Sequence, residues 1–548
     1  MKTNIFSTLK NLKKNWYFPI SAVAFFCLEA IPTKAYLLGV LFVFIASVLV
    51  SIKVSDLWSR MKQVHLGVKL FSVFSAIGIC LAGWDYCYKK WAGSTIVQRF
   101  EKKLPIDIDL SICISCLGAV CAFVFVYICI MYLITTIIDV FIESKIHQDV
   151  KTFEIIVYVM MFFISIGYMI YVFVHTDAFY GTDFFYDIIY TSDSPKLVKE
   201  NVYLILTHSE NDLRQPLFAI FAAPFAGIPY LVSRVCPISL TVKVILINSI
   251  QIILLLVANF LIAKMMKLRP LKRVCFMLLS SCTYTYMLFV LMMEQYIVAY
   301  AWLIFCIYMI CEKSKHRNLA LWGAGGTLLT SLVLVPFIST KSPLKNFKGW
   351  IADGIKSTLG FVGLMLAFGR FDIIYTAATE IPILSQYTGK EIPFMEKIFQ
   401  YTAFIHNIFV RPDAGVSHKI EAYASWQLAP VIALNLVGCV VFVLVICSLL
   451  LNWDKKFSLI AGGWVLFSVI VLLVLGWGTT ENGLILYSLY FGWAFLVLLF
   501  QLVEKIEHIF RINFLVPVVS IISIFVLVFY NGSAIIEMFN FALEYFPV

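Results

Sequence analysis

The sequence predicts an all-α polytopic membrane protein with about 13 transmembrane helices. Hydrophobic residues make up 61% of the 548 residues and charged residues only 14%, and the mean hydropathy is +0.91. A single soluble core cannot bury so much apolar surface. The net charge is +10, but the Lys and Arg residues stand in short clusters between apolar runs. Such clusters are typical of cytoplasmic loops and argue against a nucleic-acid-binding surface.

The N-terminal region, residues 1–153, is expected to contain four transmembrane helices. Its first apolar run follows a basic start and has no small-residue cleavage site after it, so it is predicted to be a retained span. Because Lys and Arg collect on the cytoplasmic side, the N-terminus is expected inside. The four expected spans lie near residues 17–32, 35–52, 66–84 and 110–141.

The next region, residues 154–370, is expected to carry the functional loop. A span near 154–174 leads out to a polar stretch, residues 175–216. Two apolar runs follow it. We interpret the first, 217–232, as a juxtamembrane helix, because a single span near 240–263 then keeps the following basic cluster in the cytoplasm.

The rest of this region is expected to hold three spans and one re-entrant segment. Spans near 274–292 and 297–311 enclose Glu294, which is expected at the external surface on the same side as the polar stretch. The segment 319–338 is interrupted by Gly and Thr, which predicts a re-entrant pair of half-helices. A span near 355–370 then leads out again.

The remaining chain comprises a second external segment, residues 371–429, and four C-terminal spans within residues 430–548. Basic residues at 455–456 and at 505–511 indicate that the chain lies on the cytoplasmic side at these two places. Because one more span follows the second cluster, the C-terminus is expected outside. The chain is therefore predicted to be a multi-pass protein of the plasma (cytoplasmic) membrane, with its N-terminus cytoplasmic and its two polar segments external.

The stretch 175–216 is the most acidic part of this apolar chain. Polar chemistry gathered on one face, with nearly charge-free spans, favours an enzyme that works at the membrane surface over a transporter, because transporters place polar groups at mid-membrane depth. An ordinary solvated loop explains the same composition. The acids are Asp177, Asp183, Asp187, Asp193, Glu200, Glu210 and Asp212.

Two motifs in this stretch, TSDSPK at 191–196 and LRQPL at 213–217, resemble those of GT-C glycosyltransferases. More narrowly, they are similar to the protein O-mannosyltransferase and aminoarabinose-transferase type and its uncharacterised bacterial relatives. In these proteins the first external loop carries an S-D-(S/T) acid and then an R-x-x-H-P-L or K-P-P-L turn. The resemblance covers residues 154 to 369 and implies a GT-C-like fold with juxtamembrane helices in that loop. Gln215 stands where the relatives have His or Lys, which removes an ionisable group.

The resemblance implies inverting transfer of a sugar from a polyprenyl-phosphate donor. This reaction needs a base beside the acceptor hydroxyl and positive groups on the departing phosphate. Asp193 matches the loop acid of the family and is the expected general base, with Asp183 and Asp187 as alternatives. Arg214 and Lys196 are expected to bind the donor phosphate. A capping role for the aspartate and interfacial snorkelling of the two cations are the structural alternatives.

Other residues are expected to support this chemistry. Glu294 begins an E-x-Y element like one that the family places at the outer end of a core helix, although an ordinary helix-end carboxylate has the same position. His208, with Glu210 and Asp212, has the N and O ligands that suit Mg or Mn, which makes a divalent cation a candidate cofactor. In the second segment, Arg411 and Asp413 are candidates, with nearby aromatic residues suited to stacking on sugars.

The predicted function is therefore a membrane glycosyltransferase acting on an extracytoplasmic acceptor, namely a cell-surface glycan, a glycolipid or a protein. The lipid bilayer and a polyprenyl-phosphate-linked sugar are its expected partners. Two other classes stay open. A lipid or solute transporter or flippase would place converging polar groups at mid-membrane depth. A polysaccharide polymerase or ligase would have Arg-dominated external loops.

Overall fold

The computed structural model describes a chain that is mainly helical. Among the described residues, nine helices are long and apolar enough to cross a membrane, and up to eleven candidate spans result if each of two bent helix pairs counts as one span. The predicted class, an all-α polytopic membrane protein, is confirmed in this coarse form, and the number of 13 spans stays a prediction. The described residues are 15–29, 36–92, 95–103, 109–143, 149–181, 188–190, 192–206, 213–340, 345–370, 373, 381–382, 385–420, 423–479 and 483–548.

The helices form two compact units, each assembled from separate parts of the sequence. Unit 1 comprises Met1–Ser144, Asn201–Ser239 and Lys315–Glu380, and unit 2 comprises Lys145–Glu200, Leu240–Ser314 and Ile381–Val548. The predicted regions follow one another along the chain, whereas these units interleave. The expected core at 154–370 is consequently divided between both units.

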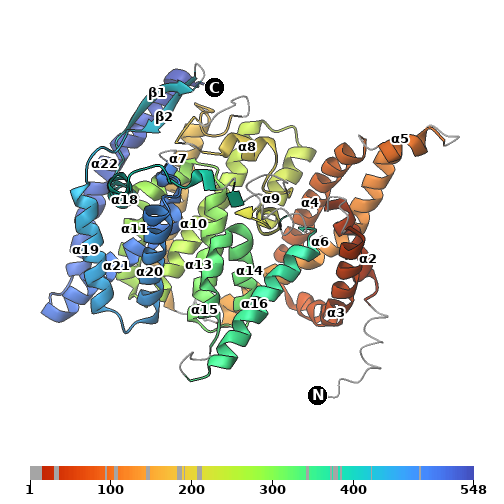
Figure 1. The fold of residues 1–548 in the computed structure, drawn as a ribbon, viewed down its shortest axis with the longest axis horizontal. Helices are drawn as coiled ribbons and strands as arrows, with labels where there is room; N and C mark the ends of the chain where they lie inside the picture. The colour runs from red at the N-terminus through yellow and green to blue at the C-terminus, as the bar shows by residue number, and fades with distance from the viewer. Residues whose placement is uncertain are drawn as a thin grey trace. The chain divides into compact units, whose positions relative to one another are not determined.

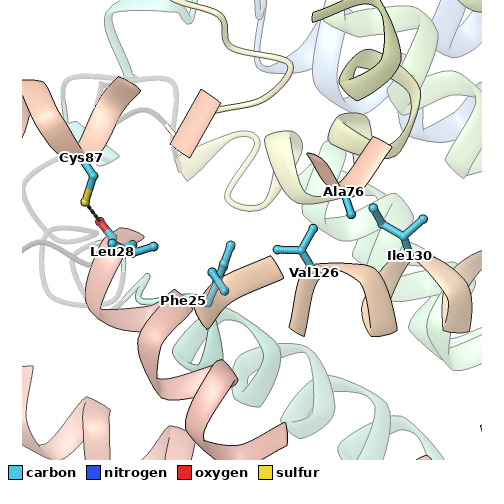
Figure 2. Close-up of a cluster of buried hydrophobic side chains, with 7 residues drawn as sticks. Phe25, Leu28, Ala76, Cys87, Val126 and Ile130 are labelled. Carbon is cyan, nitrogen blue, oxygen red and sulfur yellow. Dashed lines mark hydrogen bonds between the residues drawn. The ribbon is translucent and has the colours of Figure 1, made fainter. Parts of the chain in front are cut away.

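Unit 1 contains helices at all four positions predicted for the N-terminal spans (Figure 1). Helices α2 and α4 both pack against α6. Their contact is a buried apolar cluster in which Phe25, Ala76 and Val126 lie close together (Figure 2). The elements of unit 1 are α2 (Tyr17–Glu29), α3 (Tyr36–Gln63), α4 (Leu66–Ala92), α5 (Thr95–Glu101), α6 (Leu110–Glu143), α9 (Phe218–Val235), α14 (Arg317–Thr327), η3 (Leu329–Leu334), α15 (Val335–Ile338) and α16 (Phe347–Ala367).

Helix α9 packs so closely on α4 that their backbones touch. A Cβ atom on Gly227 would lie 2.6 Å from the carbonyl oxygen of Ser75, and one on Gly78 would collide with the carbonyl group of Gly227. Small residues allow such close approach of membrane helices. The 18-residue α9 also has the length and hydropathy of a span. The juxtamembrane position expected for residues 217–232 therefore stays a prediction.

The segment predicted to be re-entrant is broken in the structure. Helix α14 ends at Thr327, Leu328 is extended with φ −154° and ψ 100°, and the 3-10 helix η3 begins at Leu329. The side chain of Leu332 in η3 lies against Gly325 of α14, where a Cβ would come within 2.6 Å of it. The helix is therefore interrupted at Leu328, and the re-entrant arrangement of its two parts stays a prediction.

The helices of unit 2 pack around α10, α13 and α21. Helix α10 packs against α7 and α13, and α21 packs against α19, α20 and α22. Its elements are α7 (Thr152–Phe173), α8 (Ser194–Lys199), α10 (Leu240–Met265), α11 (Pro270–Ser281), α12 (Tyr284–Leu291), α13 (Gln295–Cys311), η4 (Ser385–Tyr387), α18 (Phe394–Phe409), β1 (Ala414–Ile420), β2 (Tyr423–Leu428), α19 (Leu436–Leu451), α20 (Lys456–Ser468), η5 (Val469–Val474), η6 (Gly483–Tyr487), α21 (Ser488–Phe510) and α22 (Leu515–Tyr545).

One end of unit 2 gathers ion pairs. The Arg273 guanidinium donates to both carboxylate oxygens of Glu154, each at 2.8 Å, and both side chains are buried. This end also holds Lys264 paired with Asp149, and Lys272 paired with Glu504 and Glu507. The basic clusters predicted to be cytoplasmic at 264–273 and beside α7 thus share one end of the unit.

The other end of α7 meets the end of the chain. The Thr176 hydroxyl donates to the carbonyl oxygen of Phe546 at 2.7 Å, and the Val548 N–H donates to the carbonyl oxygen of His175 at 3.1 Å. The start of the acidic stretch and the last residues therefore lie at the same end of unit 2. The charge pattern predicts them on one side, and which side of the membrane this is stays a prediction.

Candidate functional site

The candidate site lies in unit 2, where the SDS sequence at 192–194 meets the turn before α13. Glu294 directly precedes α13, and its side chain is completely buried. Its Oε1 atom accepts a hydrogen bond from the Ser192 hydroxyl at 2.7 Å and a second from the Asp193 backbone N–H at 2.9 Å. One buried carboxylate thus holds the loop by both a side chain and the backbone.

Two serines make this loop compact. The Ser192 and Ser194 hydroxyl groups lie 2.6 Å apart, and the Ser194 N–H donates to the Ser192 hydroxyl at 3.2 Å. Short hydroxyl side chains readily bond the backbone next to them, which favours turns and helix starts. The local sequence therefore forms a tight turn that begins the short helix α8.

Amide side chains of α10 fix the turn that carries Glu294. Gln251 Nε2 donates to the backbone carbonyl of Glu294 at 3.1 Å, and Asn248 Nδ2 donates to the carbonyl of Val290 at 2.8 Å. Both amides belong to an apolar span, where polar side chains are costly unless they have a structural or functional role. They supply donors to carbonyl groups that the break between α12 and α13 leaves outside a regular helix.

Asp193 is half-buried and directly precedes α8. Its backbone carbonyl accepts from the Leu197 N–H at 3.0 Å, which is the position of a residue that caps a helix. Lys196, which is predicted to bind the donor phosphate, belongs to α8, but its side chain lies outside the described part of the structure. The two alternative acids, Asp183 and Asp187, also lie outside the described residues.

The second polar segment reaches the same end of unit 2 through an unpredicted β-hairpin. Strands β1 and β2 are antiparallel (Figure 1), and Trp426 of β2 forms an isolated parallel bridge with Ile189. The Tyr190 N–H donates to the Trp426 carbonyl at 2.9 Å, and the Trp426 N–H donates to the Ile188 carbonyl at 2.8 Å. The two polar segments thus meet in unit 2, close in sequence to Ser192.

Tyr190 is buried at this junction. Its hydroxyl lies 2.6 Å from the hydroxyl of Tyr284 and accepts from the Trp426 indole Nε1 at 3.2 Å. Burial raises the pKa of Tyr190 to about 12 because the phenolate would be poorly solvated. The tyrosine is therefore neutral at physiological pH, and it links the loop, the hairpin and α12.

The candidates in the second segment have different positions. Arg411 donates to Glu537 Oε1 at 2.8 Å and to the Ser533 hydroxyl at 3.1 Å, so it ties this segment to α22. Asp413 is exposed just before β1, and its backbone carbonyl accepts from the Ala429 N–H at 2.9 Å. For Arg411 this geometry supports a structural role.

Arg214, the predicted phosphate-binding residue, belongs to unit 1, whereas Asp193 belongs to unit 2. The backbone carbonyl of Arg214 accepts from the Leu329 N–H at 2.8 Å, and the Leu217 N–H donates to the carbonyl of Gly326 at 2.9 Å. The LRQPL turn is thereby bonded to the chain on both sides of the break at Leu328. Asp193 is bonded to Glu294 at the break between α12 and α13 of unit 2. Arg214 is bonded to Leu329 just after the break that ends α14 of unit 1.

Metal ligands were predicted at His208, Glu210 and Asp212, which lie outside the described residues. Within the described part of the chain, no three His, Cys, Asp or Glu side chains gather in a way that could hold a metal ion. The expected divalent cation therefore stays a prediction.

Several residues of the site escape sequence reasoning. Nothing in the sequence singles out Tyr190, Trp426 is predicted only as one of the aromatic residues suited to stacking on sugars, and Ser192 and Glu294 are 102 positions apart. Gln251 carries the one usable signal, because a glutamine within an apolar span is itself a reason to look for a polar partner. Comparison with known proteins finds no matching family model, no similar curated protein and no similar solved structure.

Proposed function

We propose that this protein is an integral-membrane glycosyltransferase that moves a sugar from a polyprenyl-phosphate donor to the hydroxyl of an extracytoplasmic acceptor, with inversion. The acceptor class is a cell-surface glycan, a glycolipid or a protein. The motif resemblance to GT-C enzymes motivates the reaction class. The multi-pass helical architecture supplies the membrane setting that a lipid-linked donor needs.

The observation that supports this proposal most is the attachment of the SDS loop to Glu294. A flexible surface loop would leave Asp193 free to adopt many positions, and catalysis needs a positioned base. Here the backbone N–H of Asp193 is fixed by a completely buried carboxylate at 2.9 Å. The acid that matches the family motif is thus the one whose backbone is held in place.

In the proposed reaction, the Asp193 carboxylate accepts the proton of the acceptor hydroxyl as that oxygen attacks the anomeric carbon of the donor sugar. The bond between this carbon and the phosphate oxygen breaks, and the electron pair leaves with the lipid phosphate. Lys196, three positions after Asp193, balances the charge on that phosphate, and the role expected of Arg214 stays a prediction. Attack opposite the leaving group inverts the anomeric configuration. Glu294 acts as a positioning residue.

The test is transfer of radiolabelled sugar from a panel of polyprenyl-phosphate sugars by the purified protein in lipid nanodiscs. Asp193→Asn should lower transfer by about 10²-fold or more, as expected for loss of a general base. Glu200→Gln is the matched control, because Glu200 is an exposed acid at the other end of α8. Its rate should equal that of the wild type. Wild-type rates in Asp193→Asn, or no transfer from any donor, would refute the proposal.

A further inference from the structure

Helix α18 carries two polar side chains on the face that it buries inside unit 2. Lys397 and Gln400 are 8% and 7% exposed, and they belong to the same stripe of buried residues as Tyr401 and Phe404. Residues three positions apart lie on one face of a helix, so both polar side chains leave α18 on its buried side. A lysine is almost never buried unless it is paired, which makes this face a candidate binding site.

Lys397 has no hydrogen bond or ion pair with any residue that the structure describes. The main elements packed on α18 offer it no counter-charge, because α12, α19, η5 and η6 contain no Asp or Glu. Helix α21 has acids only near its far end, Glu504 and Glu507, and both pair with Lys272. Burying an ammonium group without an anion is costly, so Lys397 calls for an anionic partner.

A glycine turn determines where the end of the lysine side chain lies. A Cβ atom on Gly476 would come within 2.8 Å of Lys397 Cε and 3.0 Å of its Nζ, and Gly476 has φ +68°. The Gly476 carbonyl accepts from the Gly389 N–H at 2.9 Å and from the Thr479 hydroxyl at 2.6 Å. The turn is therefore fixed by its own hydrogen bonds, and the missing side chain leaves room for the ammonium group.

The turn lies at the same end of unit 2 as Glu294. Trp477, next to Gly476, donates from its indole Nε1 to the Tyr487 hydroxyl at 2.9 Å. The ring of Tyr487 packs edge-on against that of Tyr296, with the ring centroids 6.1 Å apart. Tyr296 follows Glu294 by two positions at the start of α13. Aromatic contacts thus connect the surroundings of Lys397 to the turn that holds the SDS loop.

A ligand can reach both polar groups. Among the partnerless side-chain atoms of the described residues, Gln400 Oε1 is completely enclosed by protein, whereas Lys397 Nζ and Gln400 Nε2 are not. The two atoms that keep open surface are therefore both hydrogen-bond donors, one charged and one neutral. Their ligand must offer at least two acceptor atoms and a negative charge.

A phosphate group meets these requirements. Its oxygen atoms point in several directions, so one group can accept from both the ammonium and the amide, and lysine is a common phosphate ligand. Helix α18 begins at Phe394, and the partial positive charge of a helix N-terminus adds to the attraction for an anion. The exposed side chains of Phe394 and Met395 suit contact with lipid chains beside a phosphate headgroup.

We propose that Lys397 and Gln400 of α18 bind one phosphate group, carried either by a membrane lipid or by a small soluble molecule. The ammonium supplies the counter-charge and the amide a second donor. This inference does not depend on glycosyl transfer, because it concerns binding of the phosphate group alone and its test contains no sugar donor.

The experiment measures binding to the full-length protein in dodecyl maltoside, a detergent that carries no phosphate. One arm is equilibrium dialysis against radiolabelled orthophosphate. The other is native mass spectrometry with dioleoyl phosphatidic acid, in which only binding that exceeds that of dioleoylglycerol counts. We expect saturable binding of one phosphate group per chain in at least one arm. Binding in the lipid arm alone assigns the phosphate to a membrane lipid, and binding in dialysis assigns it to a soluble molecule.

Lys397→Met should weaken this binding about 10- to 100-fold, the effect of one lost hydrogen bond to a charged group. The same change should leave the ligand-free melting temperature unchanged or raised, because it removes a buried charge that has no counter-charge.

Lys272→Met is the matched control. Lys272 is also largely buried, but it pairs with Glu504 at 3.3 Å and with Glu507 at 2.7 Å. This variant should melt at a lower temperature and bind phosphate with wild-type affinity. Absence of saturable binding in both arms would overturn the proposal. Wild-type affinity in Lys397→Met, or complete displacement of the phosphate by an equal concentration of acetate, would also overturn it.

Discussion

The carboxylate of Glu294 and the hydroxyl of Ser192 are separated by 102 positions in the sequence, yet they lie 2.7 Å apart in a buried hydrogen bond. The same carboxylate oxygen holds the backbone of Asp193. Asp193 of the SDS loop and Glu294 before α13, which the sequence presents as separate candidates, therefore belong to one structural element. The first prediction concerns this element.

Replacing Glu294 should separate its positioning role from a catalytic one. Glu294→Ala leaves the Ser192 hydroxyl and the Asp193 N–H without their acceptor, at a cost of about 1–3 kcal/mol for each buried group. We expect a lower melting temperature and loss of sugar transfer. Glu294→Gln keeps an acceptor oxygen and should retain partial activity.

The pH profile of transfer checks this assignment. If Glu294 only positions the loop, the Glu294→Gln variant keeps the pH dependence of the wild type at a reduced rate, because Asp193 still accepts the proton. A shifted profile in Glu294→Gln would instead identify Glu294 as the titrating base and contradict the assignment of Asp193.

The buried pair of Glu154 and Arg273 should be the most sensitive ionic contact of unit 2. Glu154→Ala leaves the Arg273 guanidinium buried without its carboxylate, and such a loss costs about 3–5 kcal/mol. Thermal unfolding in nanodiscs should show a large decrease. Lys315→Ala is the control, because the Lys315–Glu143 pair is exposed and is worth less than about 1 kcal/mol. Equal effects of the two variants would contradict this prediction.

The contact between α4 and α9 predicts a difference between two glycine substitutions. Gly227→Ala places a Cβ atom 2.6 Å from the Ser75 carbonyl oxygen, so the helices must separate, at a cost of about 1–3 kcal/mol. Gly167→Ala in α7 meets no atom within 4 Å and should stabilise its helix by up to about 1 kcal/mol. Melting temperatures of the two variants should therefore change in opposite directions, and a shared direction would argue against the close contact.

Tyr190 should make a stabilising contribution that disappears at alkaline pH. Tyr190→Phe removes the acceptor of the Trp426 indole N–H and should cost about 1–3 kcal/mol at neutral pH. Since burial raises the pKa of Tyr190 from 10 to about 12, folding favours the neutral form. Its contribution is complete below pH 10 and is lost as the pH rises towards 12.

The measurement is the difference in melting temperature between wild type and Tyr190→Phe over a pH series. Other tyrosines ionise in both proteins, so their effect cancels in this difference. The difference should shrink as the pH rises above 10. A difference that stays constant through this range would show that Tyr190 does not titrate as its burial requires.

The sequence by itself determined the membrane class and much of the relative sidedness within unit 2. Apolar runs of span length predict α7, α10 and α22 because hydrocarbon accepts only a backbone that bonds internally. Charge clusters predict that the basic residues after α10 share one end with the start of α7, and Arg273 and Glu154 meet there. The prediction that Glu294 lies on the same side as the acidic loop agrees with its bonds to Ser192 and Asp193, and the external position of both stays a prediction.

Tertiary structure alone decided which side chains meet. Hydropathy is a property of each segment, so it cannot reveal that α9 returns to α4 or that a hairpin joins residues 188–190. Those pairings depend on shape, such as the missing side chain of Gly227, and on hydrogen bonds between distant residues, such as Trp426 with Tyr190. A pattern of apolar residues states that a helix is buried, whereas complementary surfaces determine its neighbour.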